Sequence, residues 1–263
     1  MKTWEYSHPL DILPKLQQAS FRFWVDDMSQ PINGFLCLVP GTNGDGRGEI
    51  DNGKWQAIAK ELGFGLIGCF FQDKDLKSAD YCLADDGSGQ TLVNAINEFG
   101  KEHKVNVKQS KLLLWGYSAG GQFNFNFARW KPNRVLGFIV NKGAHYYHRQ
   151  VRKPTRAIPA IFFLGEQDTP ERIENIREVF AENRNKGAKW ALCEEPKCAH
   201  GICESERVSY EFFKAVTKGD KENCWTGNNE TLEIYPAKEE VDYSKTSCLP
   251  NEETAIAWKN AQI

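Results

Sequence analysis

The sequence lacks long hydrophobic runs and has no excess of charge of either sign. Its longest apolar runs, such as LLLW and IFFL, have the size of buried strands, well below the roughly 18 residues that a membrane helix requires. Lysine and arginine number 33 against 35 acidic residues, so the formal net charge is −2. Binding to nucleic acid or to an acidic membrane depends on dense positive charge. We therefore expect neither a membrane span nor a nucleic-acid partner.

Repeats, low-complexity blocks and C-x-x-C pairs are also missing from the sequence. Structural zinc sites typically use closely spaced cysteine pairs, so the run Cys198-Ala-His200-Gly-Ile-Cys203 matches a zinc site poorly. Charged residues make up 26% of the chain and hydrophobic residues 41%, which is ordinary globular usage and argues against disorder. At 263 residues the chain is long enough to form one large core.

The eight cysteines fall into two groups by their surroundings. Three lie in apolar, strand-like runs, where a cysteine acts as a small buried hydrophobe: Cys37, Cys69 and Cys193. Five lie in polar, loop-like sequence, where thiols are easily bridged in an oxidising compartment: Cys82, Cys198, Cys203, Cys224 and Cys248. We predict at least one disulfide and favour the pair Cys224 and Cys248, because that bridge would hold down the C-terminal tail.

The N-terminal residues bear on the location of the protein. The segment MKTWEYSHPLDILPK has a single lysine before Trp4 and no apolar stretch, so it does not predict a secretory signal. The loop cysteines nonetheless favour a secreted or periplasmic protein over a cytoplasmic one, and its signal would then be absent from this chain.

Apolar residues follow two periodicities that alternate along the chain. Short β-rich runs predict strands near residues 20–26, 34–40, 64–71, 111–117, 135–141, 159–165 and 188–194. Spacings of three and four residues predict helices near residues 52–62, 88–103, 119–130, 171–186 and 204–217. Such alternation favours right-handed crossovers and a mainly parallel sheet covered by helices on both faces. The predicted fold class is α/β, a three-layer α/β/α sandwich.

The two ends of the chain depart from this alternation. The first two predicted strands, joined around residues 30–34, favour an antiparallel pair at the N-terminal edge of the sheet. After about residue 218 the sequence becomes polar, and it ends in a helical pattern over residues 252–261. We therefore predict a single domain over residues 1–263, with its core at about 20–218 and an appended tail at about 219–263.

The run Gly116-Tyr117-Ser118-Ala119-Gly120 matches the G-x-S-x-G pattern of a nucleophilic serine. It follows a strong predicted strand and precedes a predicted helix, which is the context that this chemistry requires. Glycines on both sides let the strand and the helix approach each other, so that the serine hydroxyl is exposed in a strained turn. The N–H of Ala119, at the start of the helix, would face the oxyanion that forms when a carbonyl is attacked.

A serine nucleophile needs a histidine base that a carboxylate orients, and in this architecture the chain order is serine, acid, histidine. Of the five histidines, only His200 follows Ser118 with room for an intervening acid. Asp168 lies directly after a predicted strand and is our choice of acid, with Glu166 as the competitor. Asp168 also has the position of a helix cap beside Thr169, so a purely structural role stays open.

The glycine-rich loop over residues 39–48 predicts a second oxyanion donor. Its glycines free backbone N–H groups to point at an anion, and we choose the N–H of Thr42 as the donor. Oxygens in this loop also suggest calcium, but the EF-hand spacing is absent. For the substrate we select Tyr117, His145 and Tyr146, whose rings would stack on an aromatic or sugar-bearing ester. The segment around His145 is equally consistent with a solvated loop.

Taken together, these residues resemble the α/β-hydrolase superfamily over about residues 20–218. The runs LVPGTNGDGR, GYSAGG, GEQDTPE and AHG are most similar to secreted bacterial esterases of the polyhydroxybutyrate-depolymerase and feruloyl-esterase kind. The resemblance implies the α/β-hydrolase fold, Ser118 as nucleophile, His200 as base and Asp168 as acid. It also implies an acyl-enzyme intermediate and no metal or cofactor.

The expected activity is that of a serine esterase acting on a small-molecule or polymer-linked ester. Aromatic acyl, polysaccharide-linked and polyester substrates all fit this expectation. A serine peptidase or an acyltransferase would use the same residues on the same fold. A non-catalytic binding module on this scaffold is the remaining alternative.

Overall fold

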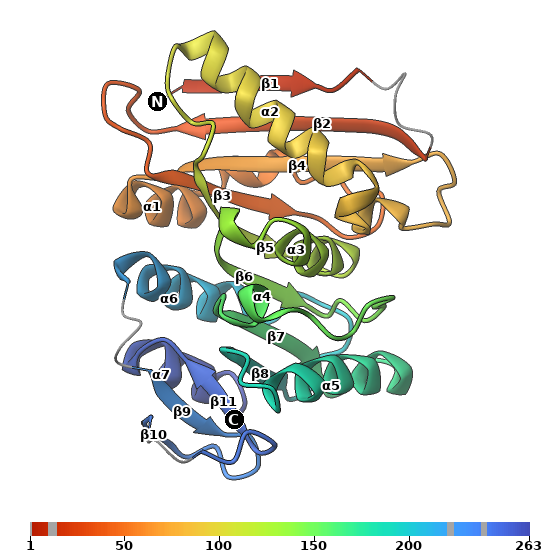
Figure 1. The fold of residues 1–263 in the computed structure, drawn as a ribbon, viewed down its shortest axis with the longest axis vertical. Coiled ribbons are helices and arrows are strands. Elements are labelled where there is room, and N and C mark those ends of the chain that lie inside the picture. Colours follow the sequence, from red (N-terminus) through yellow and green to blue (C-terminus); the bar gives the residue numbers. More distant parts are fainter. Residues whose placement is uncertain (1, 10–14, 220–223, 238–240) are drawn as a thin grey trace. The chain divides into compact units, whose positions relative to one another are not determined.

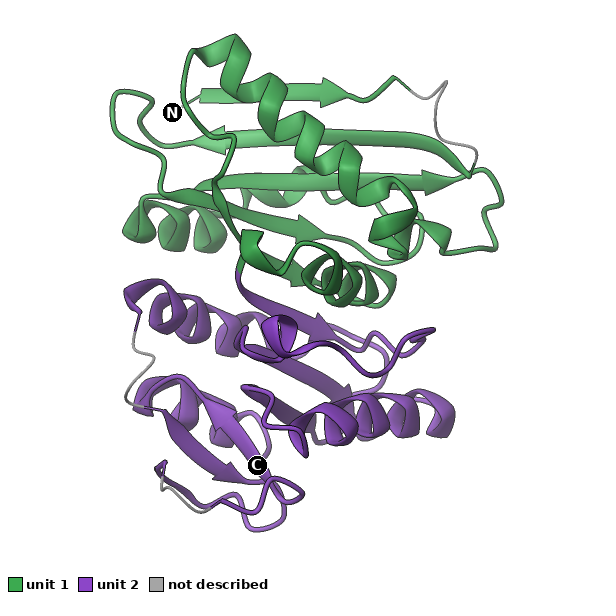
Figure 2. Ribbon diagram, viewed as in Figure 1, with its two compact units in different colours: residues 1–135 green, residues 136–263 purple. Residues whose placement is uncertain are grey.

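The computed structural model describes residues 2–9, 15–219, 224–237 and 241–263. The chain divides into two compact units, Met1–Val135 (unit 1) and Leu136–Ile263 (unit 2), which are coloured separately in Figure 2. A single domain with a tail appended after residue 218 stays a prediction. Among the helices of the described residues, none combines the length and the apolar character needed to cross a bilayer.

Five strands form the sheet of unit 1 in the order β1-β2-β4-β3-β5. Their bounds are β1 (Lys2–Ser7), β2 (Leu16–Val25), β3 (Gly34–Val39), β4 (Gly65–Asp73) and β5 (Lys111–Gly116). Strands β4, β3 and β5 are parallel, whereas β2 is antiparallel to both β1 and β4 (Figure 1). Val39 pairs with Gly116, so β3 and β5 end side by side and the loops that follow them start together.

The antiparallel edge exists, but its predicted pairing is wrong. We expected β2 and β3 to be joined as neighbours around residues 30–34, yet β4 lies between them in the sheet. Strand β4 is buried almost throughout and pairs with β2 over most of its length, which a local turn signal does not reveal. The edge strand β1 was not predicted, although Trp4 and Tyr6 alternate with polar residues in it.

Three α-helices of unit 1 match the predicted ranges closely: α1 (Gly53–Leu62), α2 (Ser88–His103) and α3 (Ala119–Trp130). Short 3₁₀ helices occur at η1 (Arg47–Asp51), η2 (Asp80–Cys82), η3 (Ala84–Asp86) and η4 (Pro132–Arg134). The phenylalanines of α3 alternate with asparagine, which by itself suggests a strand. The segment is nevertheless a helix, and its asparagines are buried together with the phenylalanines: the Asn126 side chain donates to the Cys82 carbonyl at 2.9 Å.

In unit 2, parallel strands β6 (Val135–Asn141), β7 (Ala160–Gly165) and β8 (Trp190–Glu195) lie in that order. Its helices are α4 (Lys153–Arg156), α5 (Pro170–Arg184), α6 (Ser205–Lys218) and α7 (Glu252–Asn260). Gly165 pairs with Glu195, so β7 and β8 also end side by side. The strands and helices of both units agree with the predicted α/β class.

The C-terminal segment forms a small sheet that the sequence did not predict, in the order β10-β9-β11. Its strands are β9 (Trp225–Asn228), β10 (Ile234–Pro236) and β11 (Thr246–Leu249). The Ser247 hydroxyl accepts the Leu192 N–H at 2.8 Å, and the Trp258 indole N–H donates to the Leu192 carbonyl at 2.6 Å. These contacts satisfy backbone groups of β8 that would otherwise form an open sheet edge.

The predicted disulfide is present, but it joins other cysteines than those we favoured. Cys198 and Cys203 form the bridge, with their Cα atoms 6.5 Å apart. Cys224 and Cys248 remain thiols. The tail is held by β11 and α7 rather than by a bridge, and the turn that brings residues 198 and 203 together is not visible in the sequence. Cys82 is buried rather than in an exposed loop.

Replacing both bridged cysteines, Cys198→Ala with Cys203→Ala, should lower the free energy of unfolding by about 2 kcal/mol, because the bridge restricts the unfolded chain. Urea unfolding measures this. Reductant should destabilise the wild-type protein by a similar amount and leave the double variant unchanged. A reductant effect that persists in the double variant would show that another bridge carries the stability.

Asp73 makes the stability of unit 1 depend on pH. Its side chain is fully buried at the end of β4 and accepts the Tyr81 N–H at 3.1 Å. Burial raises the pKa of Asp73 to about 6, against the opposing effect of the Tyr81 amide. The folded state therefore keeps a proton that the unfolded state loses from about pH 4 upward, and this contribution to stability declines as the pH rises through about 6.

We expect Asp73→Asn to remove this dependence. The difference in unfolding free energy between the wild-type protein and the variant should change by up to about 3 kcal/mol between pH 4 and pH 7, with the wild type losing stability relative to the variant as the pH rises. Urea unfolding at several pH values measures it. A constant difference across this range would contradict the assignment.

Candidate active site

Ser118 lies in a sharp turn between β5 and α3. Its backbone has φ 53° and ψ −122°, a conformation that residues with a side chain seldom adopt. The Ser118 carbonyl accepts the Gly121 and Gln122 N–H groups at 2.9 and 3.2 Å, which starts the helix immediately after the turn. The side chain is neither buried in the core nor fully exposed. This is the strand, strained turn and helix that the G-x-S-x-G pattern predicts.

The two glycines of the pattern are required by close backbone approaches. A Cβ on Gly120 would collide with the carbonyl oxygens of Val39 and Pro40, at the end of β3. A Cβ on Gly116 would collide with the Gly120 carbonyl oxygen. The start of α3 is therefore pressed against the ends of both β3 and β5, which leaves no room for any larger residue at either position.

The loop after β3 passes beside the serine. A Cβ built on Gly41 would lie 3.4 Å from the Cβ of Ser118 and 3.3 Å from the Tyr117 ring. The Gly44 N–H donates to the Gly41 carbonyl at 2.9 Å, closing a turn that includes Thr42. Ala119 supplies an N–H of the first turn of α3, whose amides have no acceptor within the helix. Both predicted oxyanion donors thus belong to segments that adjoin Ser118.

The oxygens that suggested calcium in this loop are used by the protein itself. The Asn43 side chain donates to the Leu76 carbonyl at 2.8 Å and accepts the Asp73 N–H at 3.1 Å. The Asp45 carboxylate pairs with the Arg47 guanidinium, with an oxygen to nitrogen distance of 2.6 Å. These contacts fix the loop and indicate a structural role for both residues.

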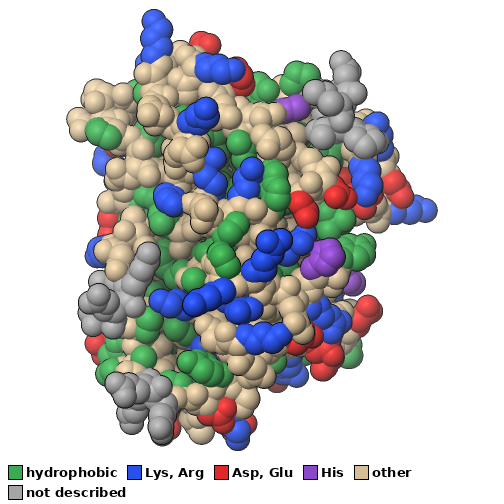
Figure 3. Space-filling model, in the orientation of Figure 1, with side chains coloured by type: hydrophobic (Ala, Val, Ile, Leu, Met, Phe, Trp, Pro, Cys, Tyr) green, Lys and Arg blue, Asp and Glu red, His purple; other side chains and the backbone are tan. Residues whose placement is uncertain are grey.

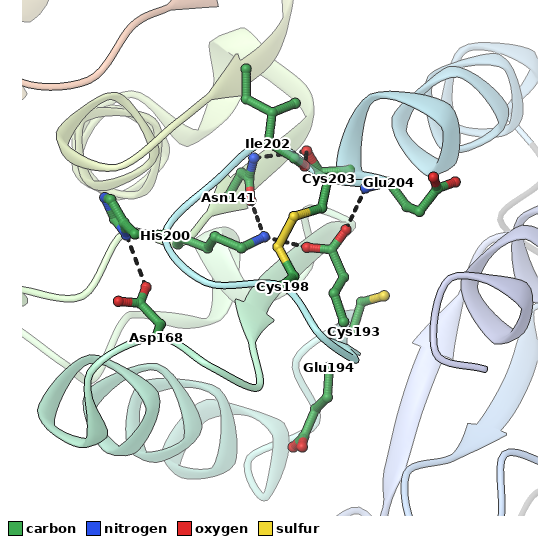
Figure 4. Close-up of polar contacts among 12 residues, drawn as sticks. Asn141, Asp168, Cys193, Glu194, Cys198, His200, Ile202, Cys203 and Glu204 are labelled. Carbon is green, nitrogen blue, oxygen red and sulfur yellow. Dashed lines mark hydrogen bonds and ion pairs between the residues drawn. A yellow bond between two sulfur atoms is a disulfide. The ribbon is translucent and has the colours of Figure 1, made fainter.

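Asp168 and His200 meet in unit 2. Oδ2 of Asp168 lies 2.8 Å from Nδ1 of His200, and the Asp168 side chain is only 3% exposed while that of His200 is 31% exposed (Figure 4). The other oxygen of Asp168 accepts the Thr169 N–H at 2.8 Å. Asp168 therefore has both the local contact expected from its position beside the helix and a contact with the histidine.

Glu166, the competing acid, binds elsewhere. Its carboxylate accepts the Lys197 N–H at 3.1 Å. Its own N–H donates to the Glu195 carbonyl at 3.0 Å, and the Gln167 N–H donates to the Cys198 carbonyl at 2.9 Å. These bonds join the loop after β7 to the loop after β8 and place Asp168, rather than Glu166, opposite His200.

The loop that carries His200 is held at both of its ends. The Cys198–Cys203 disulfide spans the histidine, as Figure 4 shows. A buried ion pair that the sequence analysis missed, Lys142 with Glu195, lies at the start of the loop. Burial raises the pKa of Glu195, and the Lys142 ammonium opposes this shift. The sequence signal for the pair is weak: a single lysine directly after an apolar strand.

The predicted substrate residues are less well defined. Tyr117 is half-buried beside Gly41, and His145 is exposed. The Tyr146 hydroxyl donates to the Gly143 carbonyl, whereas Tyr147 is 75% exposed. Tyr117 belongs to unit 1 together with Ser118, and the segment around His145 belongs to unit 2 together with Asp168 and His200.

Each unit can supply one part of a nucleophilic reaction. An imidazole held through Nδ1 by a carboxylate presents Nε2 as a base, which is the arrangement that activates a hydroxyl. A serine in a strained turn beside backbone N–H groups has the features of a nucleophile with an oxyanion site.

No protein-family model matches the sequence, and no curated protein matches it either. Solved structures do resemble it. Poly(aspartic acid) hydrolase-1 from Sphingomonas sp. KT-1 has 18% sequence identity and a TM-score of 0.56, with 80% of this chain and 97% of that chain covered. A ferulic acid esterase has 10% identity and a TM-score of 0.59, covering 82% and 98%. Dienelactone hydrolase from Anabaena variabilis has 14% identity and a TM-score of 0.55, covering 81% and 97%.

At these identities the likeness concerns the fold. It extends over about four fifths of this chain and nearly the whole of each of the three solved structures. The chain has the α/β-hydrolase fold.

Proposed function

We propose that the protein is a carboxylic ester hydrolase that uses Ser118, His200 and Asp168 as its catalytic residues. The observation that supports this most is the contact between Asp168 and His200. Chain order selected the histidine and the position after a strand selected the acid, and Oδ2 of Asp168 lies 2.8 Å from Nδ1 of His200. The strained turn at Ser118 supports the role of the third residue. The similar solved structures include an esterase and two other hydrolases, which agrees with the proposed class of reaction.

The reaction would proceed in two steps. Ser118 Oγ attacks the ester carbonyl carbon while His200 Nε2 takes its proton, and the N–H groups of Ala119 and Thr42 stabilise the oxyanion. The protonated His200 then donates to the leaving alcohol, which departs and leaves an acyl-enzyme. In the second step water gives a proton to His200 and attacks the acyl carbon, and the proton returns to Ser118 as the acid leaves. Asp168 holds the imidazole in the tautomer with hydrogen on Nδ1.

The substrate we propose is an uncharged ester with an aromatic, sugar-bearing or polyester acyl part, contacted by Tyr117, His145 and Tyr146. The charge of the protein suits such a substrate, because the formal net charge is only −2 and Figure 3 shows acidic, basic and uncharged side chains mixed on the visible face. A secreted or periplasmic location is part of the proposal, and the Cys198–Cys203 bridge supports it, since disulfides persist in oxidising compartments.

A peptidase or acyltransferase would use the same residues, and a binding module would use the fold without chemistry. Initial rates with short esters, peptides and alcohol acceptors separate the first two from an esterase. Labelling by a fluorophosphonate separates any of these enzymes from a binding module, since the reagent needs an activated serine.

Ser118→Ala should lower the rate of p-nitrophenyl acetate hydrolysis by about 10⁴-fold or more, because the variant lacks the hydroxyl that would form the acyl-enzyme. The same variant should no longer be labelled by a fluorophosphonate. Circular dichroism and the melting temperature check that it folds. Turnover retained in a folded Ser118→Ala protein would rule out the proposed nucleophile.

Asp168→Asn and Glu166→Gln form a matched pair that separates the two acids. The first should lower kcat by about 10³- to 10⁴-fold, because the amide no longer holds the imidazole in the required tautomer. The second should change kcat by less than about threefold, since Glu166 contacts only the loop backbone among the described residues. The same loss of kcat in both variants would mean that loop geometry, and not the identity of the acid, decides activity.

A further inference from the structure

The ends of β6 and β8 carry an ion pair that takes no direct part in the proposed reaction. Lys142 follows β6 and Glu195 ends β8, and their side chains are 0% and 2% exposed. The Lys142 ammonium contacts a carboxylate oxygen of Glu195 and donates to the Asn141 side-chain oxygen at 3.0 Å. The pair is therefore enclosed by protein and fully engaged.

A buried ion pair of this kind adds little to the free energy of unfolding. Removing two charges from water offsets most of their attraction, and well-packed apolar residues of similar size often stabilise a protein as well or better. Lys142 also has φ 58°, a left-handed conformation that is unfavourable for a residue with a side chain. The fold keeps both a buried charge pair and a strained backbone at this position, which suggests a constraint other than stability.

The contacts of Glu195 show which segment the pair fixes. Glu195 begins the loop that carries His200, and its second oxygen accepts the N–H of Glu204, at the other end of that loop, at 2.7 Å. One carboxylate thus closes the loop across nine residues and is itself fixed by Lys142. The disulfide lies inside the same span (Figure 4).

A second branch leads from the lysine to the loop. Asn141, which accepts from Lys142, donates to the Ser205 hydroxyl at 2.7 Å. The Ser205 hydroxyl in turn donates to the Ile202 carbonyl at 2.6 Å. Glu195 and Asn141, the two partners of Lys142, therefore both bind the segment between residues 195 and 205. Among the described contacts, these are the ones that connect β6 to that segment.

We propose that Lys142 and Glu195 are positioning residues that hold the His200 loop in the geometry needed for proton transfer. This inference rests on the proposed function, because it assigns the pair a role only if His200 is the base. Neither residue touches the reacting atoms. Their effect is on the placement of His200, and small displacements of a catalytic group lower rates strongly.

The test compares Lys142→Met with the double variant Lys142→Met and Glu195→Met. The single variant leaves Glu195 buried without its partner and should be less stable, whereas the double variant should regain melting temperature because two apolar side chains replace the pair. If the pair had only a structural role, the double variant would regain kcat together with stability. If the pair positions His200, kcat of the double variant stays low, because this variant has no carboxylate to accept the Glu204 N–H.

We expect kcat for p-nitrophenyl acetate to fall at least about tenfold in both variants, with KM within about twofold of the wild type. Arg184→Met is the matched control: Arg184 is a buried cation of the same unit that binds the carbonyls of Thr246 and Ala188, away from the His200 loop. It should lower the melting temperature and leave kcat within about twofold.

Glu195→Gln keeps the shape and an acceptor oxygen, and it covers the case in which the methionine variants do not fold. It should lower kcat by at least about threefold, since it loses the charge that Lys142 holds. A kcat within twofold of the wild type in the folded double variant, or in Glu195→Gln if the others do not fold, overturns the inference. An equal loss of kcat in Arg184→Met also overturns it.

Fluorophosphonate labelling of the wild type distinguishes this failure from failure of the proposed function. If the wild-type protein is not labelled at Ser118, the proposed function fails and the positioning role fails with it. If the wild type is labelled and the folded double variant is labelled at the same rate, only the positioning role fails.

Discussion

The structure of unit 1 depends on one close approach, between the start of α3 and the end of β3. Gly120 lies against the Val39 and Pro40 carbonyls with no space for a Cβ, and Gly116 lies against Gly120 in the same way. Because the backbone is this tight, the residue between them has to turn sharply, and Ser118 takes the strained conformation. The same approach brings the loop after β3 alongside the serine. One steric constraint therefore sets the serine turn and the neighbouring amides together.

Unit 2 adds hydrogen bonds and charge to close packing: a Cβ on Gly165 would collide with the carbonyl oxygens of Cys198 and Ala199. The loops after β7 and β8 start side by side because Gly165 and Glu195 are paired, and backbone bonds from Glu166 and Gln167 then hold them together. Because the two loops are held at this distance from each other, Asp168 in the first contacts His200 in the second. The buried Glu195 carboxylate and the disulfide close the second loop around the histidine, so its position is set from both ends.

Polar groups buried at strand ends recur in both units. The Asp73 side chain, at the end of β4, accepts the Tyr81 N–H, and this buried carboxyl makes stability depend on pH. The backbone N–H of Asp73 donates to the Asn43 side chain, so the same residue also holds the loop after β3. Lys142 and Glu195 have the corresponding place in unit 2. In each case an energetically unfavourable group is retained at the edge of the sheet where loops leave the strands. Apolar side chains could fill this space but could not bind loop amides, and this is the physical reason for the polar residues there.

Local sequence determined the elements, the serine turn and the choice of His200. Periodicity of apolar residues placed most strands and helices within a few residues, because each pattern reflects the local backbone repeat. The G-x-S-x-G run and the scarcity of histidine were sufficient to name Ser118 and His200. Only the tertiary structure decided that β4 lies between β2 and β3, that Cys198 bridges Cys203, and that Lys142 meets Glu195. These are contacts between residues distant in sequence, or turns set by such contacts, and no local repeat encodes them.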